Sequence, residues 1–290
     1  MNDTDRIIRH TPPGATLGEG PLWSRRDRCV YWVDILENTI HAWYLDDTTR
    51  SWHVPEHIGW LIEREKGDFI CGLMSGFAEL TLDPLTIRHI HNPYPHEPLN
   101  RMNDAKADAA GRIWAGTMHK PITQVSGALY RLDPDMSVRE MDGPYKVANG
   151  PAFTADHTRV YHTDTGIGEV YVFDVTPDGG LANKRLFVKF SGDMGSPDGM
   201  TVDAQDGLWI ASWGGGCVIR FNADGSEDFR VALPARQITS IVFGGDSLDR
   251  AFCTSAAENL PDDREAGTLF EIPSEFLRGH TGLEPMKFKG

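Results

Sequence analysis

A turn followed by an apolar, strand-like run recurs six times along the chain. One apolar residue of each run serves as an anchor for comparing them: Val30, Phe69, Ile113, Val160, Leu208 and Ala251. Consecutive anchors lie 39 to 48 residues apart, and a second strand-like run follows each anchor. A period of this length, with room for four short strands, is typical of a β-propeller blade.

The six periods occupy the chain from about residue 14 to about residue 275 and leave no linker over. We therefore predict an all-β fold, a six-bladed β-propeller with four-stranded antiparallel blades, as a single domain over residues 1–290. A β-sandwich would explain the strands but not their constant period. The ring must also close, so either the stretch at 6–9 or the stretch at 286–288 should complete a terminal blade.

Composition limits the possible partners and the compartment. The net charge of −14 disfavours nucleic acid and anionic membranes as partners, because both require a basic surface. No apolar run is long enough to span a bilayer, and the first residues are too polar and acidic for a secretory signal. The four cysteines show no C-x-x-C spacing, so we expect buried, reduced thiols. The prediction is a cytoplasmic protein, a monomer or weak oligomer, with a small-molecule substrate.

An oxygen-bearing side chain precedes four of the anchors at nearly the same distance. Glu19 and Asn149 lie 11 residues before their anchors, and Asn103 and Asp198 lie 10 residues before theirs. If the strand that precedes each anchor is the innermost of its blade, its first residues line one mouth of the central channel. The four side chains should then meet around the axis although they are far apart in sequence.

Two carboxylates and two amide carbonyls without a thiolate are suited to a hard cation such as Ca²⁺, Mg²⁺ or Mn²⁺, and Zn²⁺ or Fe(II) could also occupy such a site. Asn-Gly-Pro and Pro-Asp-Gly are also common turn formers. Turn chemistry alone does not explain why all four residues share one phase of the repeat. We therefore predict one divalent metal ion as cofactor.

The motifs that carry these residues resemble a known family, the SMP-30/gluconolactonase/regucalcin family. They are the segments Leu17-Gly18-Glu19-Gly20-Pro21-Leu22-Trp23, Arg101-Met102-Asn103-Asp104, Asn149-Gly150-Pro151 and Pro197-Asp198-Gly199-Met200. The resemblance extends over the whole chain in register with the six repeats. It implies a six-bladed propeller that hydrolyses sugar-acid lactones with one catalytic divalent metal, and the bacterial members most similar in motif are xylonolactonases and arabinolactonases.

The resemblance also implies roles for individual residues. Glu19, Asn149 and Asp198 look like the three metal ligands, and Arg101 and Asn103 look like the substrate-binding pair, with Asp104 beside them. The family often has a glutamate after the third anchor strand. This chain has none between Gly116 and Lys120, and His119 is predicted to take that place in substrate binding.

These residues suggest a hydrolase that acts on a carboxylic ester. Asp198 is predicted to be both a metal ligand and the general base toward water, while Arg101 and Asn103 orient the ring hydroxyls. The alternatives are a calcium-binding regulatory protein of the regucalcin type, another propeller esterase or lyase, and a protein-binding propeller. The nearby stretch from His162 to Thr165 is expected to form buried hydrogen bonds within its own blade.

Overall fold

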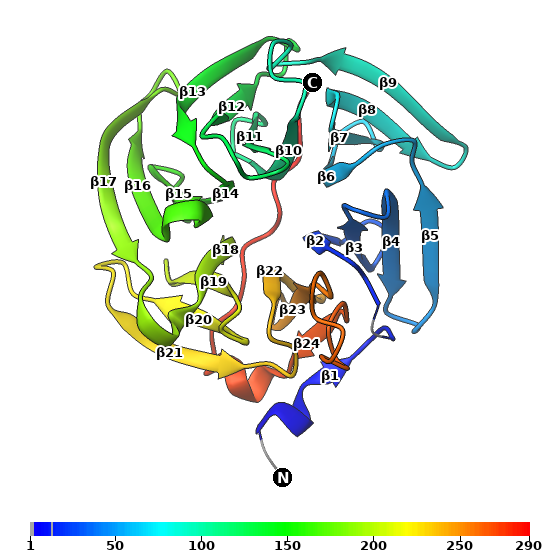
Figure 1. Cartoon of the computed structure of the whole chain (residues 1–290), viewed down its shortest axis with the longest axis vertical. Helices are drawn as coiled ribbons and strands as arrows, with labels where there is room; N and C mark the ends of the chain where they lie inside the picture. Colours follow the sequence, from blue (N-terminus) through cyan, green and yellow to red (C-terminus); the bar gives the residue numbers. More distant parts are fainter. Residues whose placement is uncertain (1–2, 13) are drawn as a thin grey trace.

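Six antiparallel sheets of four strands each form a closed ring around a central channel (Figure 1). This computed structural model describes residues 3–12 and 14–290. The described residues contain no α-helix. Their helical turns are four short 3-10 segments, η1 (Asp3–Arg6), η2 (Thr165–Ile167), η3 (Gly192–Met194) and η4 (Ser274–Leu277). The predicted all-β, six-bladed propeller is confirmed.

Each blade runs from an inner strand at the channel to an outer strand at the rim. Blade 1 is β2 (Gly18–Ser24), β3 (Cys29–Asp34), β4 (Thr39–Tyr44) and β5 (Thr49–His53), and blade 2 is β6 (Ile58–Glu63), β7 (Phe69–Leu73), β8 (Gly76–Leu82) and β9 (Leu85–His91). Blade 3 is β10 (Asn100–Ala107), β11 (Ile113–His119), β12 (Gly127–Leu132) and β13 (Val138–Tyr145), and blade 4 is β14 (Ala148–Phe153), β15 (Arg159–Asp164), β16 (Glu169–Val175) and β17 (Leu181–Lys189). Blade 5 is β18 (Ser196–Val202), β19 (Leu208–Trp213), β20 (Cys217–Phe221) and β21 (Glu227–Ala232), and blade 6 is β22 (Ile238–Gly244), β23 (Arg250–Ser255), β24 (Phe270–Ile272) and β1 (Ile8–Arg9).

The hydrophobic core is divided among the spaces between neighbouring blades. Six apolar clusters of the described residues each join two adjacent blades, as where Trp114 of blade 3 packs against Phe153 of blade 4 with ring centroids 5.9 Å apart. The second strands, such as β3 and β11, are buried along their whole length, which explains their largely apolar runs. The outer strands, such as β5 and β9, are largely exposed and alternate in polarity.

The N-terminal segment closes the ring. β1 pairs antiparallel with β24, so that Ile8 lies opposite Glu271 and Arg9 opposite Phe270. Of the two predicted alternatives, the stretch at 6–9 therefore completes the terminal blade. The stretch at 286–288 does not, and it follows a different course.

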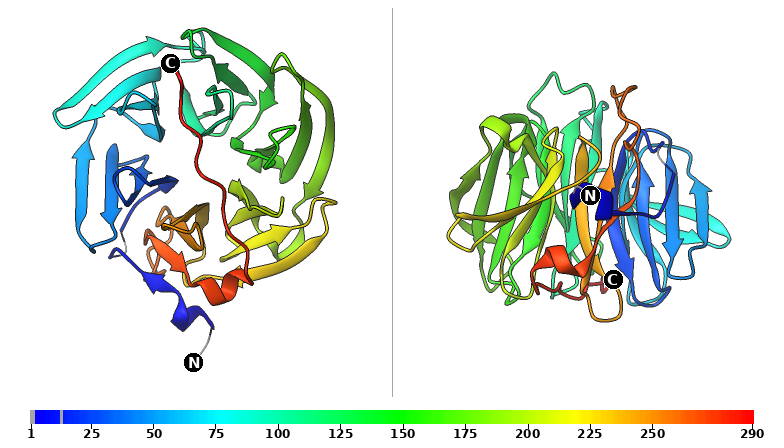
Figure 2. Two further views of the ribbon diagram at one scale, coloured as in Figure 1. Left: turned by 180° about the vertical axis from the view of Figure 1, so that it is seen from behind. Right: turned by 90° about the horizontal axis from the view of Figure 1, so that it is seen from below.

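The C-terminal tail, residues 281–290, crosses one end of the central channel (Figures 1 and 2). The Phe288 backbone exchanges hydrogen bonds with Glu63 and Glu65, and the Phe288 ring is fully buried between blades 2 and 3. Arg64 donates to the Gly290 carbonyl at 2.8 Å, and Lys287 pairs with Glu63 at 2.8 Å. The tail therefore binds across several blades at the end of the channel where the inner strands finish.

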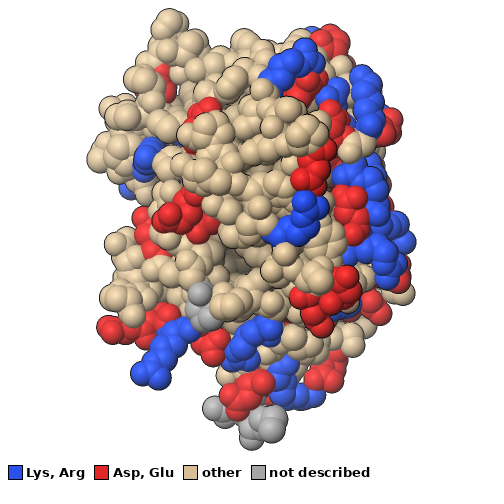
Figure 3. All heavy atoms as spheres, turned by 90° about the vertical axis from the view of Figure 1, so that its right-hand side faces the viewer, with Lys and Arg blue, Asp and Glu red and all other residues tan. Residues whose placement is uncertain are grey.

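The charged side chains on the surface and the state of the cysteines agree with what the composition led us to expect. On the side formed by the rims of blades 1 and 2, basic and acidic side chains are interspersed, and Arg50 pairs with Asp83 at 2.8 Å (Figure 3). Cys29, Cys71, Cys217 and Cys253 are buried free thiols, as predicted. No helix within the described residues is both long and apolar enough to cross a bilayer.

One buried histidine stands out in blade 4. His162 on β15 is fully buried, and neither ring nitrogen has a hydrogen-bond partner among the described residues. Its ring lies 4.6 Å from that of Tyr145. Burial lowers the pKa of His162 to about 3, with Asp142 opposing the shift, so the imidazole is neutral in the folded protein near neutral pH.

Replacing His162 with leucine should therefore make the protein less sensitive to acid. Between about pH 6.5, the ordinary pKa of histidine, and about pH 3, the unfolded chain takes up a proton at His162 and the folded protein does not. The wild type should lose about 1.4 kcal/mol of unfolding free energy per pH unit through this group as the pH falls below about 6.5, and H162L should not. Urea titrations of both proteins measure the difference.

The control is the same pair above about pH 7.5, where the two stability curves should run parallel because His162 is neutral in both states. Equal slopes for both proteins below about pH 6.5 would show that His162 takes up its proton in the folded state.

Candidate functional site

Every inner strand carries a β-bulge near its start. The register with the second strand shifts between Glu19 and Leu22 in blade 1, and the equivalent shift recurs in all six blades. A bulge leaves one residue unpaired and redirects the neighbouring side chains. The nearly constant distance between these residues and their anchors in the sequence therefore reflects a bulge at the same position of each inner strand. The bulge turns side chains at the same height of each blade toward the axis.

Two of the predicted metal ligands are followed directly by glycines with left-handed backbones. Gly20 after Glu19 has φ +53°, and Gly150 after Asn149 has φ +77°. L-residues rarely adopt this conformation, so glycine is the natural residue at these bulges. The turn-like appearance of these motifs and their role in directing a side chain have the same cause.

A chain of hydrogen bonds links four of the predicted site residues across three blades. Arg101 Nη1 donates to Asn103 Oδ1 at 2.7 Å, and Asn103 Nδ2 donates to Asn149 Oδ1 at 2.9 Å. Asn149 Nδ2 in turn donates to Asp198 Oδ1 at 2.6 Å. All four side chains are at most 6% exposed. The structure therefore brings together residues that lie almost 100 positions apart in sequence.

Asn103 uses both its amide hydrogens and one lone pair of its amide oxygen within this network. Its Nδ2 also donates to the Ala148 carbonyl at 2.8 Å, so both amide hydrogens are used, and its Oδ1 accepts from Arg101. Arg101 uses Nη1 for Asn103 and for the Met102 carbonyl at 2.9 Å. No hydrogen bond from Arg101 Nε or Nη2 is found among the described residues, so these groups could bind an external ligand.

Asp104 lies beside Asn103 within the same bulge, but its carboxylate faces the backbone. Oδ1 accepts from the Ala105 N–H at 2.7 Å, and Oδ2 accepts from the Gly150 N–H at 3.1 Å. Asp104 therefore ties the bulge of blade 3 to that of blade 4. The geometry supports a positioning function for this residue, which was predicted from sequence to contact substrate.

His119 lies at the end of β11, one strand further from the axis than the other predicted residues, and is 2% exposed. It pairs in register with Asn100, the residue before Arg101. Its Nδ1 lies 3.3 Å from Thr123 Oγ1 in the following loop. The hydrogen-bond chain from Arg101 to Asp198 includes neither His119 nor Glu19, whose Oε2 accepts from the Gly20 N–H at 3.0 Å.

The site concentrates negative charge away from water. Burial raises the pKa of Glu19, Asp104 and Asp198, and repulsion from Asp104 adds to the shift of Glu19, while repulsion from Glu19 and Asp104 adds to that of Asp198. Arg101 is the nearest buried cation; burial lowers its pKa to about 10, so it remains charged near neutral pH. Three acids face Arg101 and Lys106, whose charges act on Glu19.

The donor set suits a divalent cation. Glu19, Asn149 and Asp198 offer two carboxylates and one amide carbonyl, all oxygen donors of the kind that hard cations prefer. A bound cation would also stabilise the ionised forms of Glu19 and Asp198, which burial disfavours. No three His, Cys, Asp or Glu side chains in the described part of the chain are arranged to hold a metal, so a site here requires the Asn149 amide as its third ligand. On this chemistry the predicted ligands fit the predicted metal.

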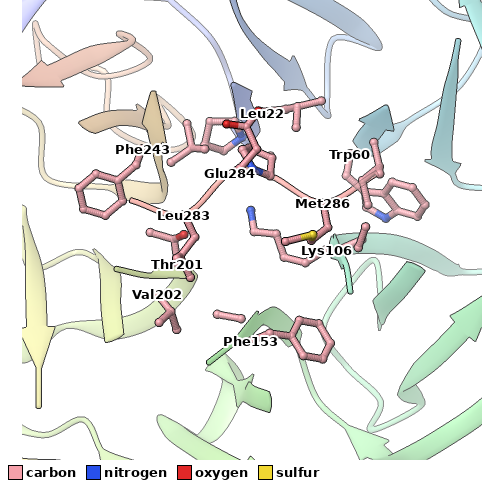
Figure 4. Close-up of a pocket in the computed structure, with 18 of the residues that line it drawn as sticks. Leu22, Trp60, Lys106, Phe153, Thr201, Val202, Phe243, Leu283, Glu284 and Met286 are labelled. Carbon is pink, nitrogen blue, oxygen red and sulfur yellow. The ribbon is translucent and has the colours of Figure 1, made fainter. Parts of the chain in front are cut away.

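The opposite end of the channel is apolar and covered by the tail. A cavity of about 100 Å³ begins behind the bulges at Gly20 and Ala105, and residues Leu283 to Met286 of the tail form part of its wall (Figure 4). Lys106 reaches into this space (Figure 4). A ligand of the site should therefore enter from the mouth where the inner strands begin.

Residues that orient the site were not identified from sequence. Asp164 forms hydrogen bonds within blade 4, accepting from the Lys146 and Val147 N–H groups, as expected for this stretch. Thr165 also bonds within blade 4, where its hydroxyl accepts from Asn149 Nδ2 at 2.9 Å, and in addition it donates to the Pro197 carbonyl of blade 5 at 2.7 Å. Asp34 accepts from the Thr16 and Leu17 N–H groups in blade 1. The sequence signal that could have identified these contacts is an aspartate at the end of the second strand of a blade, Asp34 in blade 1 and Asp164 in blade 4.

Comparison with known proteins gives the same assignment. Residues 17–257 match the family described as "SMP-30/Gluconolactonase/LRE-like region". A 6-deoxy-6-sulfogluconolactonase of Pseudomonas putida is 36% identical over 276 residues, covering 94% of this chain and 92% of the relative. An L-arabinolactonase of Azospirillum brasilense is 32% identical over 285 residues, covering 95% of this chain and 93% of the relative.

A solved structure matches the fold over nearly the whole chain. A luciferin-regenerating enzyme superposes with a TM-score of 0.92 at 28% identity, covering 98% of this chain and 99% of the other. The matched residues include every predicted site residue from Glu19 to Asp198. The chain belongs to the SMP-30/gluconolactonase family, and its relatives include lactonases, which are hydrolases that act on carboxylic esters.

Proposed function

We propose that this protein is a metal-dependent lactonase that hydrolyses a sugar-acid lactone to the open-chain aldonic acid, as a step in sugar oxidation. One observation carries the proposal: Arg101, Asn103, Asn149 and Asp198 form a buried hydrogen-bonded chain at one mouth of the channel. Two of these residues belong to an oxygen-donor set suited to a cation, and two belong to a polar pair suited to a sugar. The lactonases among the relatives support the reaction class.

The metal would be held by Glu19, Asn149 and Asp198. A site with only three protein ligands keeps positions open for water and substrate, as catalytic metal sites do. When bound, a divalent cation polarises the lactone carbonyl and stabilises negative charge on its oxygen. A purely calcium-buffering role suits such a site poorly, because Ca²⁺ prefers six to eight oxygen ligands.

Asp198 would act as the general base toward the attacking water. The Asn149 amide holds Oδ1 at 2.6 Å and thereby fixes the rotation of the carboxylate. In the metal-free site, burial and the neighbouring carboxylates raise the pKa of Asp198, and the charge of a bound cation would lower it again. The proton taken from water would pass to the ring oxygen as the lactone opens.

Arg101 would bind the sugar. Its contacts through Nη1 with Met102 and Asn103 anchor one edge of the guanidinium group, and a planar fork is suited to paired hydroxyl oxygens. Asn103 supports this arrangement by accepting from Arg101. The substrate class we propose is a five- or six-carbon aldonolactone, and the product is an anion whose release from a net acidic protein is favourable.

A lactone panel with defined metals tests the proposal. Chelator-treated protein should be inactive toward glucono-, xylono-, arabino- and galactonolactone, and Mn²⁺, Zn²⁺, Ca²⁺ or Mg²⁺ should restore acid release in a pH-indicator assay. Spontaneous hydrolysis without protein is the control. Full activity after exhaustive chelation would contradict metal dependence. Metal binding without turnover of any lactone would favour a regulatory cation-binding protein.

Asp198→Asn should reduce kcat by about 10²- to 10⁴-fold at saturating metal, because it removes the base while keeping the shape of the side chain. Asp193→Asn provides a matched control, since Asp193 lies five residues earlier with its side chain 87% exposed. D193N should retain wild-type kinetics. A D198N variant with wild-type kcat at saturating metal would show that another group activates the water.

A further inference from the structure

Thr165 joins two blades beside the predicted metal ligands. It is the first residue of η2, directly after β15 of blade 4. Its Oγ1 donates to the Pro197 carbonyl of blade 5 at 2.7 Å and lies 2.9 Å from Asn149 Nδ2. A hydroxyl group has one hydrogen to donate. Because that hydrogen goes to Pro197, Thr165 can act only as an acceptor toward Asn149.

This contact helps to decide which end of the Asn149 amide faces the channel. The two hydrogens of Nδ2 go to Thr165 Oγ1 and Asp198 Oδ1. Oδ1 then points the opposite way and accepts from Asn103 Nδ2. A carbonyl oxygen has two lone pairs, so one remains for a further partner. Only this end of an amide can bind a cation, because the NH₂ group is a donor.

The same hydroxyl also sets the distance between two ligands on different blades. Pro197 immediately precedes Asp198, so the bond from Thr165 to the Pro197 carbonyl holds the backbone next to Asp198. The bond from Asn149 to Thr165 holds the neighbouring ligand against the same point. Thr165 is therefore a clamp between Asn149 and Asp198 that does not itself require a cation.

The clamp is firmly supported from within blade 4. Asp164 caps η2 by accepting from the Gly166 N–H at 3.1 Å, and it also accepts from the Lys146 and Val147 N–H groups. The Thr165 N–H donates to the Val147 carbonyl at 2.9 Å. The turn is thus fixed to the segment that leads into Asn149, and Thr165 has little freedom to move relative to it.

We infer that Thr165 is a positioning residue that orients the Asn149 amide and fixes its spacing to Asp198, so that both are prepared to bind a divalent cation. The inference rests on the proposed metal-dependent function. It goes beyond the ligand set, because it assigns metal affinity to a side chain outside that set. Partners that orient metal ligands typically contribute 10- to 100-fold in metal affinity.

Isothermal titration of chelator-treated protein with Mn²⁺ tests this inference. Thr165→Val keeps the shape of the side chain and removes the hydroxyl, so its Kd should rise about 10- to 100-fold. Thr165→Ser restores the hydroxyl and should bind within about threefold of the wild type. Thr163→Val is the matched control on the preceding strand β15, because the buried Thr163 hydroxyl has no hydrogen-bond partner among the described residues.

The outcomes separate this inference from the proposed function. A T165V variant that binds Mn²⁺ with the wild-type Kd would overturn the positioning role while leaving the lactonase proposal intact. A wild-type protein that binds no divalent cation would instead overturn the proposed metal site itself. A comparable loss of affinity in T163V or T165S would attribute the effect to general disturbance of blade 4 and also overturn the inference. The metal-free Tm of T165V should fall by only a few degrees, because the Pro197 carbonyl and one Asn149 amide hydrogen lose their partner while the interblade core is unchanged.

Discussion

Closure of the ring is the constraint on which the rest of the structure depends. Six sheets can enclose a channel only if the last blade is completed, and β1 does this by pairing two residues with β24. Closure then places every inner strand at the same height and in the same orientation around the axis. A bulge at one position of each strand is enough to turn side chains from separate blades toward a common point.

At this common point, the burial of several acidic side chains is energetically unfavourable. Glu19, Asp104 and Asp198 are each at most 5% exposed, and burial disfavours their charged forms. Such an arrangement costs stability in a metal-free protein and is characteristic of functional sites, where local rules are broken for the sake of chemistry. The surrounding interblade clusters are apolar by contrast, and their burial stabilises the blades that carry the site.

The sequence allowed the fold and the centre of the site to be predicted because both depend on periodicity. The anchors from Val30 to Ala251 defined the blades, and the fixed distance before them selected Glu19, Asn103, Asn149 and Asp198. The closing strand could not be chosen, because 6–9 and 286–288 are both short and strand-like and only packing separates them. The C-terminal tail instead crosses one end of the channel, because the Phe288 side chain packs into an apolar space between blades 2 and 3.

The contacts between blades could not be predicted from the sequence either, because they too depend on packing. Nothing in the residues around Asp104 shows that its oxygens bind backbone N–H groups of blades 3 and 4. Thr165 was expected to bond within its own blade, and it does so through Asn149, but the sequence did not show that its hydroxyl also donates to Pro197 of blade 5. The position of a residue within the repeat identifies which side chains face the axis, but it does not identify the hydrogen-bond partner of each one.

The central claim is that Glu19, Asn149 and Asp198 hold a cation at the open mouth of the channel. Crystals of the protein grown with Mn²⁺, measured at the manganese absorption edge, test it most directly. We predict a single anomalous peak on the axis, about 2.0–2.6 Å from Asn149 Oδ1 and from a carboxylate oxygen of each acid. A channel without a peak, or a peak bound by other residues, would contradict the account.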